Sequence, residues 1–162
     1  RMGTYEGMDR YDEGMKVNTR LDNGGMWNGL NSALRSDHRA EGVREEDRCL
    51  AARALKEYGN LQRDTEVMRC KVYAILLPAY TILGMEEEAA KLVGVMQTML
   101  PLVKAEQSRA LAVVTLYGCT DSSIYYHLAH EAVDPWKKEE KPKKSKQQLI
   151  SRLADYDRWL RH

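Results

Sequence analysis

Apolar residues recur at intervals of three and four along most of this chain, which is the spacing of a helix with one buried face. The clearest example is the segment SKQQLISRLADYDRWL, residues 145–160. Its large apolar residues follow the 3.6-residue period closely; they are Leu149, Ile150, Leu153, Tyr156, Trp159 and Leu160. The stretch KVYAILL, residues 71–77, could be a buried strand in isolation, but no partner strand appears elsewhere. The pattern therefore predicts an all-α fold.

The same spacing and its interruptions predict six or seven helices in a single domain, residues 26–162. We expect helices near residues 26–34, 44–58, 64–84, 85–100, 104–118, 121–132 and 145–160. Gly84 and Gly118 are predicted helix ends, and Gly59 is a predicted C-terminal stop. Pro101 should break its helix, and Pro78 should kink or break the one that contains it.

Composition and the N-terminal segment limit the class of protein. Residues 1–25 hold five glycines and no sustained period, which predicts a flexible arm or one that only a partner orders. Apolar residues at 43% and charged residues at 30% are typical of a soluble globular protein. No apolar run is long enough to span a bilayer, and the stretch RMGTYEGMDRYDEG lacks the apolar core of a secretory signal. Cys49, Cys70 and Cys119 are odd in number and widely spaced, so we expect reduced thiols and a cytoplasmic location.

Positive charge is concentrated at the C-terminus. Residues 134–162 hold nine Lys or Arg and five Asp or Glu, a net +4, whereas the rest of the chain holds 16 basic and 19 acidic residues, a net −3. Six lysines lie between positions 137 and 146, in a predicted basic loop, residues 134–146, directly before the last helix. This asymmetry favours a polyanionic partner at that end of the molecule.

The last helix carries the residue types that read a DNA groove. Amide and guanidinium groups can pair with base edges, while lysine and serine side chains and the helix N-terminus can hold phosphates. Ser145, with Gln148 three residues on, is a predicted capping box at its start. The predicted DNA-binding residues, expected to point mostly away from the core, are Lys137, Lys138, Lys141, Lys143, Lys144, Ser145, Lys146, Gln147, Gln148, Ser151, Arg152 and Asp155.

The helix before the basic loop, near residues 121–132, is expected to be short and amphipathic. Thr120 or Asp121 can cap its N-terminus. Its inward face is predicted to hold Ile124, Leu128, Ala129 and Ala132. A short apolar helix followed by an amphipathic one with a basic start is the pattern of a helix-turn-helix unit, here residues 104–162.

Two alternatives to DNA reading stay open. Lys, Gln, Ser and Arg along one side of a helix also describe an ordinary solvated face. The run VVTLYGC followed by a lysine-rich tail has a faint likeness to lentiviral matrix proteins, which favours a viral helical structural protein whose basic loop binds nucleic acid or membrane. The last helix shows no second apolar face, so we expect no membrane association.

The C-terminal motifs also resemble known families. LAVVTLYGCTDSSIYYHLA followed by SKQQLISRLADYDRWL is similar to the helix-turn-helix of sigma factor region four. AAKLVGVMQTMLPL and RLADYDRWL resemble segments of the late-gene antitermination proteins of lambdoid phages, the Q proteins. The resemblance covers residues 86–162. It departs from the family in the twelve to fifteen residues between the two motif helices, where the common turn has three or four.

The resemblance implies a role without catalysis. Such a protein binds a DNA element near a late promoter in the cytoplasm of the bacterial host and loads onto paused RNA polymerase with its sigma factor. It then suppresses pausing and termination while nascent RNA passes nearby. Some members carry a zinc finger, but this chain has no CxxC pair and would belong with those that lack zinc.

No residue set predicts an active site, a metal site or a bound cofactor. Cys119, His127 and His130 match no standard zinc spacing, and a fourth ligand is not apparent. His127 and His130 are instead expected on the surface of a short helix. Ser122 or Ser123 near His127 lacks the elbow and glycine pattern of a nucleophile site. We therefore predict that the protein is not an enzyme.

Overall fold

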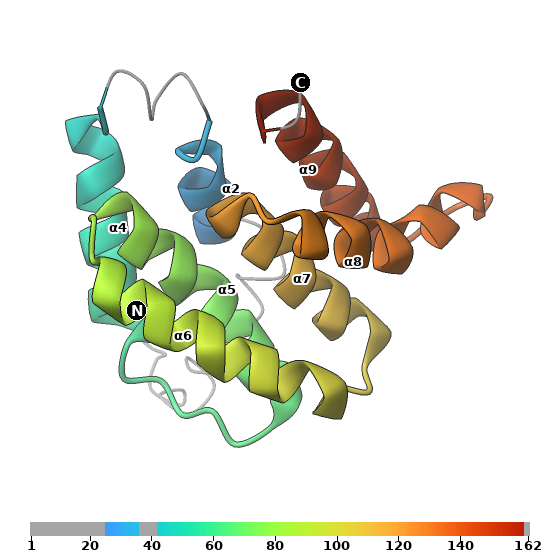
Figure 1. The fold of residues 1–162 in the computed structure, drawn as a ribbon, viewed down its shortest axis with the longest axis horizontal. Helices are drawn as coiled ribbons and strands as arrows, with labels where there is room; N and C mark the ends of the chain where they lie inside the picture. The colour runs from blue at the N-terminus through green and yellow to red at the C-terminus, as the bar shows by residue number, and fades with distance from the viewer. Residues whose placement is uncertain (1–24, 36–41, 161–162) are drawn as a thin grey trace, which may run out of the picture.

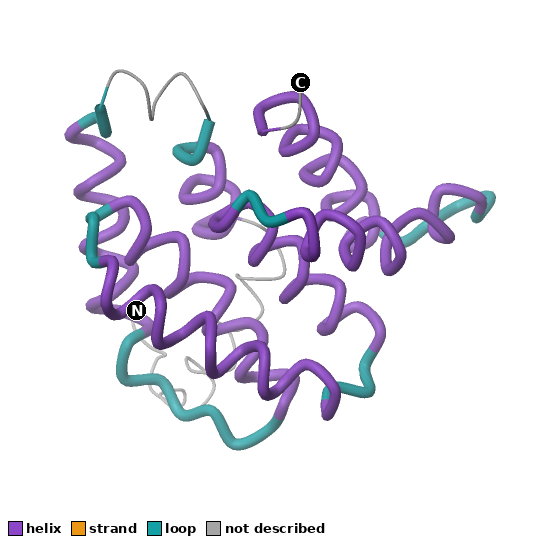
Figure 2. The backbone as a smooth tube through the Cα atoms, in the orientation of Figure 1, coloured by secondary structure: helices purple, strands orange, loops and turns teal. Residues whose placement is uncertain are grey.

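Seven α-helices and two short 3-10 helices form the computed structural model, which describes residues 25–35 and 42–160 (Figures 1 and 2). The helices are α2 (Gly25–Ser32), α4 (Glu45–Tyr58), α5 (Glu66–Ile82), α6 (Glu86–Met99), η1 (Leu100–Leu102), α7 (Glu106–Thr120), α8 (Ser123–Val133), η2 (Asp134–Lys138) and α9 (Lys144–Leu160). No strand occurs in these two ranges, so the predicted all-α fold is confirmed. The predicted flexible arm lies outside the described residues except for Gly25.

Helix α5 is the centre of the fold and packs against α2, α4, α6 and α7 (Figure 1). Ten of its 17 residues are buried, including the whole run from Val72 to Ala79. Thr65 caps its start by accepting a hydrogen bond from the Met68 amide at 3.1 Å. Of the kink or break predicted at Pro78, the break does not occur, because the helix continues through the proline to Ile82. Proline removes one backbone donor, and burial on all sides holds the helix together across that loss.

Helix α6 ends where the sequence indicated. Its last residue is Met99, and Pro101 lies in the following 3-10 turn, so the predicted break at Pro101 is confirmed. Gly84, which precedes α6, has φ of +72°, a left-handed conformation that glycine adopts without strain. The short connection positions α6 beside α5.

Helix α7 does not stop at Gly118, as the sequence predicted, but runs to Thr120. Asp121 ends it in the left-handed conformation, with φ of +54°. Gly118 is buried inside the helix, where a Cβ would lie within 2.7 Å of the Tyr156 hydroxyl and even closer to its ring. The glycine therefore allows α7 and α9 to approach closely. Ser122, rather than Thr120 or Asp121, caps the next helix by accepting from the Ile124 amide at 3.2 Å.

The predicted inward face of α8 is correct at Ala129 and wrong at Ile124 and Leu128. Tyr125, Ala129 and Val133 are buried, whereas Ile124 is 66% exposed and Leu128 36% exposed. The aromatic ring of Tyr125 takes the core position, and its hydroxyl accepts a hydrogen bond from Gln97 of α6. Two large aliphatic residues are left on the outside.

Helices α2 and α9, at opposite ends of the described chain, are in direct contact. The Tyr156 hydroxyl donates to the amide oxygen of buried Asn31, and the Trp27 indole donates to Thr115 of α7 at 3.3 Å. Leu149, Leu153 and Tyr156 form the buried side of α9. The short N-terminal helix therefore forms part of the surface on which the C-terminal helix rests.

Candidate nucleic-acid interface

Trp136 anchors the basic loop to the body of the protein. Trp136 in η2 is 2% exposed, and its indole Nε1 donates to the Glu106 carboxylate at 3.1 Å. The residues around it project from the body of the molecule between α8 and α9 (Figure 1). An anchored tryptophan within an exposed loop holds the lysines that follow it near the start of α9.

The six lysines of the loop are not equivalent. Lys137 Nζ lies 3.1 Å from Asp134, and Lys146 Nζ lies 2.8 Å from Glu139 and 5.2 Å from the centre of the Trp136 ring. These two cations are already engaged. The other four are exposed, and no carboxylate in the described ranges pairs with them; they are Lys138, Lys141, Lys143 and Lys144.

Helix α9 presents one continuous polar face to solvent. We call it the outer face of α9 and define it by its exposed residues, Lys144, Gln147, Ser151, Ala154 and Arg158. They follow one another at intervals of three and four, opposite the buried Leu149, Leu153 and Tyr156. At its centre are the small residues Ser151 and Ala154, which let another surface approach the helix closely.

Arg152, a predicted DNA contact, is instead buried and 8% exposed. Its guanidinium Nη2 donates to the Asn28 carbonyl at 3.4 Å, to the Asn28 side-chain oxygen at 3.3 Å and to Ser32 Oγ at 3.3 Å. It also lies 5.7–6.0 Å from the ring centres of Trp27, Tyr156 and Trp159. These cation–π contacts and hydrogen bonds secure α9 to α2, so Arg152 cannot reach a base while the helix stays packed.

Asp155 links the buried arginine to the outer face. One carboxylate oxygen lies 3.5 Å from Arg152 Nη1, and the other accepts a hydrogen bond from Arg158. Asp155 was predicted to contact DNA directly. The structure places it between two guanidinium groups, where it orients the exposed Arg158 side chain.

The predicted capping box at the start of α9 is wrong. The helix begins one residue earlier, at Lys144, and the Ser145 hydroxyl donates to Gln107 of α7 at 2.6 Å. Gln148 is partly buried, and Gln147 is the exposed glutamine, donating to the Pro142 carbonyl at 2.8 Å. Ser145 therefore joins α9 to α7 and is not available to a phosphate.

Sequence reasoning missed Ala154 and Arg158. Their positions continue the spacing of Gln147 and Ser151 along the outer face, so a helical wheel could have found them. Arg152 was predicted to be exposed because its side chain is charged. The rings that enclose it belong to Trp27 of α2 as well as to Tyr156 and Trp159 of α9, so its burial could not be seen from α9 alone.

The connection between α8 and α9 keeps the long insertion seen in the sequence. Residues 134–143 separate the two helices and include η2, so a three- or four-residue turn is not present at this point. Helices α7 and α8 are joined by only two residues, Asp121 and Ser122. A helix-turn-helix unit therefore stays a prediction.

The sequence predicted that His130 lies on the surface of its helix. Its side chain is instead largely enclosed and connects α8 to α9. Its Nδ1 lies 3.0 Å from Asp134 and its Nε2 lies 2.7 Å from Asp157, which also accepts from the Tyr117 hydroxyl at 2.9 Å. Burial raises the pKa of Asp134, but hydrogen bonds from His130 and Lys137 outweigh burial and bring that pKa below its ordinary value. His127, by contrast, is exposed. No cluster of three metal-ligating side chains occurs among the described residues.

Comparison with protein-family models, curated proteins and solved structures finds no match for this chain. The likeness to the antitermination proteins therefore rests on the motifs of residues 86–162 alone. None of the helices in residues 25–35 and 42–160 is long and apolar enough to span a bilayer.

Proposed function

We propose that this chain is a non-enzymatic protein that binds duplex DNA through the outer face of α9 and the basic loop beside it. The observation that carries the proposal is that the outer face of α9 and the basic loop are next to each other. A continuous exposed face on a 17-residue helix, polar except at the small residue Ala154, begins where four exposed lysines without ion pairs gather in the described structure. A solvated face on its own would not require a lysine-rich loop fixed at its N-terminus.

The dimensions of α9 suit a major groove. Its 17 residues span about 25 Å, and the groove of B-DNA is about 12 Å wide, enough to admit a helix. Ser151 and Ala154 allow the backbone to lie near the base edges. Once released from the Pro142 carbonyl and from Asp155, the Gln147 amide can pair with an adenine and the Arg158 guanidinium with a guanine. The four lysines without ion pairs and the first amides of the helix hold phosphates.

For the biological role, we propose transcription regulation on RNA polymerase, specifically antitermination at a promoter-proximal pause. Support comes from the resemblance of residues 86–162 to the phage late-gene antitermination proteins and to sigma factor region four. Under this proposal the DNA element recognised by α9 lies beside the promoter, and polymerase with its sigma factor is the protein partner.

The electrostatic part of the proposal is tested by the salt dependence of DNA affinity. Because each phosphate contact releases counterions, Lys143→Ala or Lys144→Ala should lower the slope of log K against log salt by about 0.9. Lys56→Ala is the matched control, an exposed lysine on α4, and should leave the slope unchanged. Binding to duplex DNA that is absent or insensitive to salt contradicts the proposal. Flotation with phosphatidylserine vesicles in that case would favour the matrix-like alternative.

The second part of the proposal, sequence-specific recognition of bases by α9, is tested at a binding site selected from random duplex DNA. Gln147→Ala and Arg158→Ala should each weaken binding to that site by about 1–3 kcal/mol and leave non-specific binding nearly unchanged. Lys91→Ala, on α6, serves as the exposed control. Equal losses on every DNA sequence would reduce Gln147 and Arg158 to phosphate contacts and remove α9 as the reading helix.

A further inference from the structure

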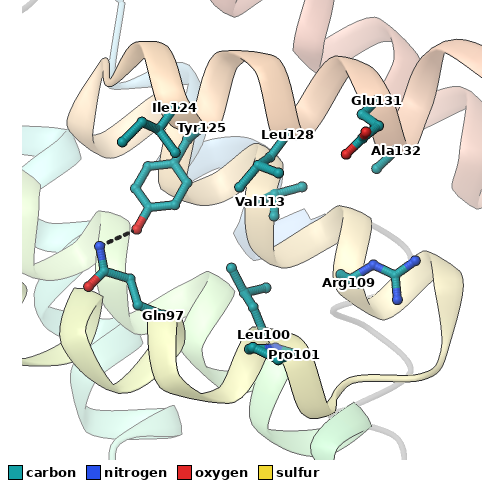
Figure 3. A pocket seen from close by; sticks show the side chains of 10 residues that line it. All are labelled: Gln97, Leu100, Pro101, Arg109, Val113, Ile124, Tyr125, Leu128, Glu131 and Ala132. Carbon is teal, nitrogen blue, oxygen red and sulfur yellow. Dashed lines mark hydrogen bonds between the residues drawn. The ribbon is translucent and has the colours of Figure 1, made fainter.

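An apolar groove separates α8 from α6 and the η1 turn (Figure 3). Its volume is about 590 Å³, within the range of sites that bind ligands and short peptides. Leu100 and Pro101 form one wall, Ile124 and Leu128 form the other, and Val113 of α7 lies between them.

The two ends of the groove are polar. At one end Gln97 donates a hydrogen bond to the Tyr125 hydroxyl, which ties α6 to α8 (Figure 3). At the other end lie Arg109 and Glu131. Arg109 Nη1 donates to the Val103 carbonyl at 2.9 Å, and the rest of its exposed guanidinium can reach an acidic partner.

The aliphatic wall of the groove is unusually exposed. Ile124 is 66% exposed and Leu128 36%, on the same side of the same helix. Leaving large aliphatic side chains beside a preformed apolar hollow costs free energy that an occupant would recover, at about 25 cal/mol per Å² covered. An occupant should therefore carry apolar side chains at regular intervals. Because Arg109 on α7 and Glu131 on α8 lie at the same end, acidic groups of the occupant should lie on the α7 side of the groove.

The chain itself contains such a segment. Residues 5–13 read YEGMDRYDE, three triplets that each begin with a large apolar residue followed by an acidic one. Tyr5, Met8 and Tyr11 are three residues apart. In a polyproline II conformation, with three residues per turn, this order places the apolar side chains along one line and the acidic side chains along a second, parallel line.

The spacing of the triplets fits the groove. Successive apolar residues would be about 9 Å apart at 3.1 Å per residue. The stretch of α8 from Ile124 to Ala132 covers about 12 Å at 1.5 Å per residue, so two of the three can enter together. The line of acidic residues would then pass Arg109.

The segment can also reach the groove. Twenty residues separate Tyr5 from Gly25, a span of up to about 68 Å. The described domain should be about 37 Å across, from the usual relation between chain length and radius of gyration. A tether of this length gives an effective concentration in the millimolar range, so even weak intrinsic affinity suffices for substantial occupancy.

We propose that residues 5–13 of this chain bind intramolecularly in the groove between α6–η1 and α8, with two of Tyr5, Met8 and Tyr11 packed against Ile124 and Leu128. The segment acts as a tethered ligand that covers this apolar surface. A competing partner would gain the groove only by displacing it.

Methyl NMR of the full chain tests this proposal. The chain has four isoleucines, Ile75, Ile82, Ile124 and Ile150. The Ile124 δ1 methyl should show NOEs to Tyr5, Met8 or Tyr11, and its shift should change in the variant Tyr5→Ser/Met8→Ser/Tyr11→Ser. The buried Ile75 and Ile82 methyls report that the fold is intact. Asn18→Ser/Thr19→Ser/Arg20→Ser, in the same segment but outside the triplets, should leave Ile124 unchanged.

Two results would overturn the proposal. An Ile124 methyl that has no NOE to the triplets and the same shift in wild type and triple variant shows that the segment does not bind there. An Ile124 shift that depends on protein concentration, and is lost on dilution, assigns the groove to a second copy of the chain. Both measurements are made without DNA, so failure of this proposal and failure of the proposed DNA-binding function can be told apart.

Discussion

Replacing Gly118 with alanine should destabilise the protein even though alanine is the better helix former. In an open helix the change would stabilise by about 1 kcal/mol. At this position the new Cβ would overlap the Tyr156 ring, and overpacking of this kind costs about 1–3 kcal/mol. If the ring moves away, the buried Asn31 oxygen loses its hydrogen bond from Tyr156, at a further cost of about 1–3 kcal/mol. The net expected loss is about 1–5 kcal/mol, centred near about 3 kcal/mol.

Thermal unfolding followed by circular dichroism at 222 nm measures this loss. For a chain of this size the expected decrease in Tm is about 5–10 °C. Gly94→Ala is the matched control, because Gly94 is also inside a helix, is exposed, and has no atom within 4 Å of an added Cβ. It should raise Tm by about 2–3 °C.

A double-mutant cycle separates overlap with the ring from other effects. In a Tyr156→Ala background, Gly118→Ala should no longer destabilise, because the ring that it meets is gone. A Gly118→Ala protein as stable as wild type, or one equally destabilised with and without the tyrosine, would refute the close packing of α7 on α9 as the reason for this glycine.

Two further predictions concern titratable groups. Because the pKa of Asp134 lies below its ordinary value of 3.8, its charged form stabilises the fold above that pH, and this contribution disappears as pH falls through the lowered pKa. Asp134→Asn should therefore lower Tm at pH 6 and lower it less at pH 3, with a small difference because the side chain is half exposed. An equal effect at both pH values would contradict the hydrogen bonds from His130 and Lys137. Burial raises the pKa of the Cys70 thiol to about 11. A thiol reagent at pH 8 should label exposed Cys49 in the native protein and Cys70 only after unfolding, and rapid native labelling of Cys70 would contradict its burial.

The sequence located most helices because their spacing is a local property. The 3.6-residue period identifies α9 from its own residues, and Pro101 ends α6 where its missing donor predicts. Helix ends were less certain. Glycine is the residue that most often ends a helix, and Gly118 was predicted to do so. Whether a glycine ends a helix or makes room for a neighbouring ring depends on what packs beside it, which here is Tyr156, 38 positions away in the sequence.

The candidate interface was predicted in part. Five of the six lysines of the loop, and Gln147 and Ser151, are exposed as expected, because clustered charge and helical spacing are visible without tertiary information. Lys146 is not exposed as predicted, because its side chain lies against Glu139 and the Trp136 ring. Arg152 and Ser145 were assigned to solvent and are instead held by α2 and α7. Their partners are remote in sequence, so no local pattern distinguishes these side chains from exposed ones.

By itself, then, the sequence determined that this chain is helical, where its helices run, and that its positive charge gathers before the last of them. Only the tertiary structure decided which individual side chains face outward where the spacing of a helix allows more than one answer. Packing rotated α8 so that Tyr125 fills the core and Ile124 does not, and α2 enclosed Arg152 while Arg158 stayed in solvent. The physical reason is that periodicity depends on neighbours along one helix, whereas burial depends on volume, rings and hydrogen-bond partners that other helices bring into contact.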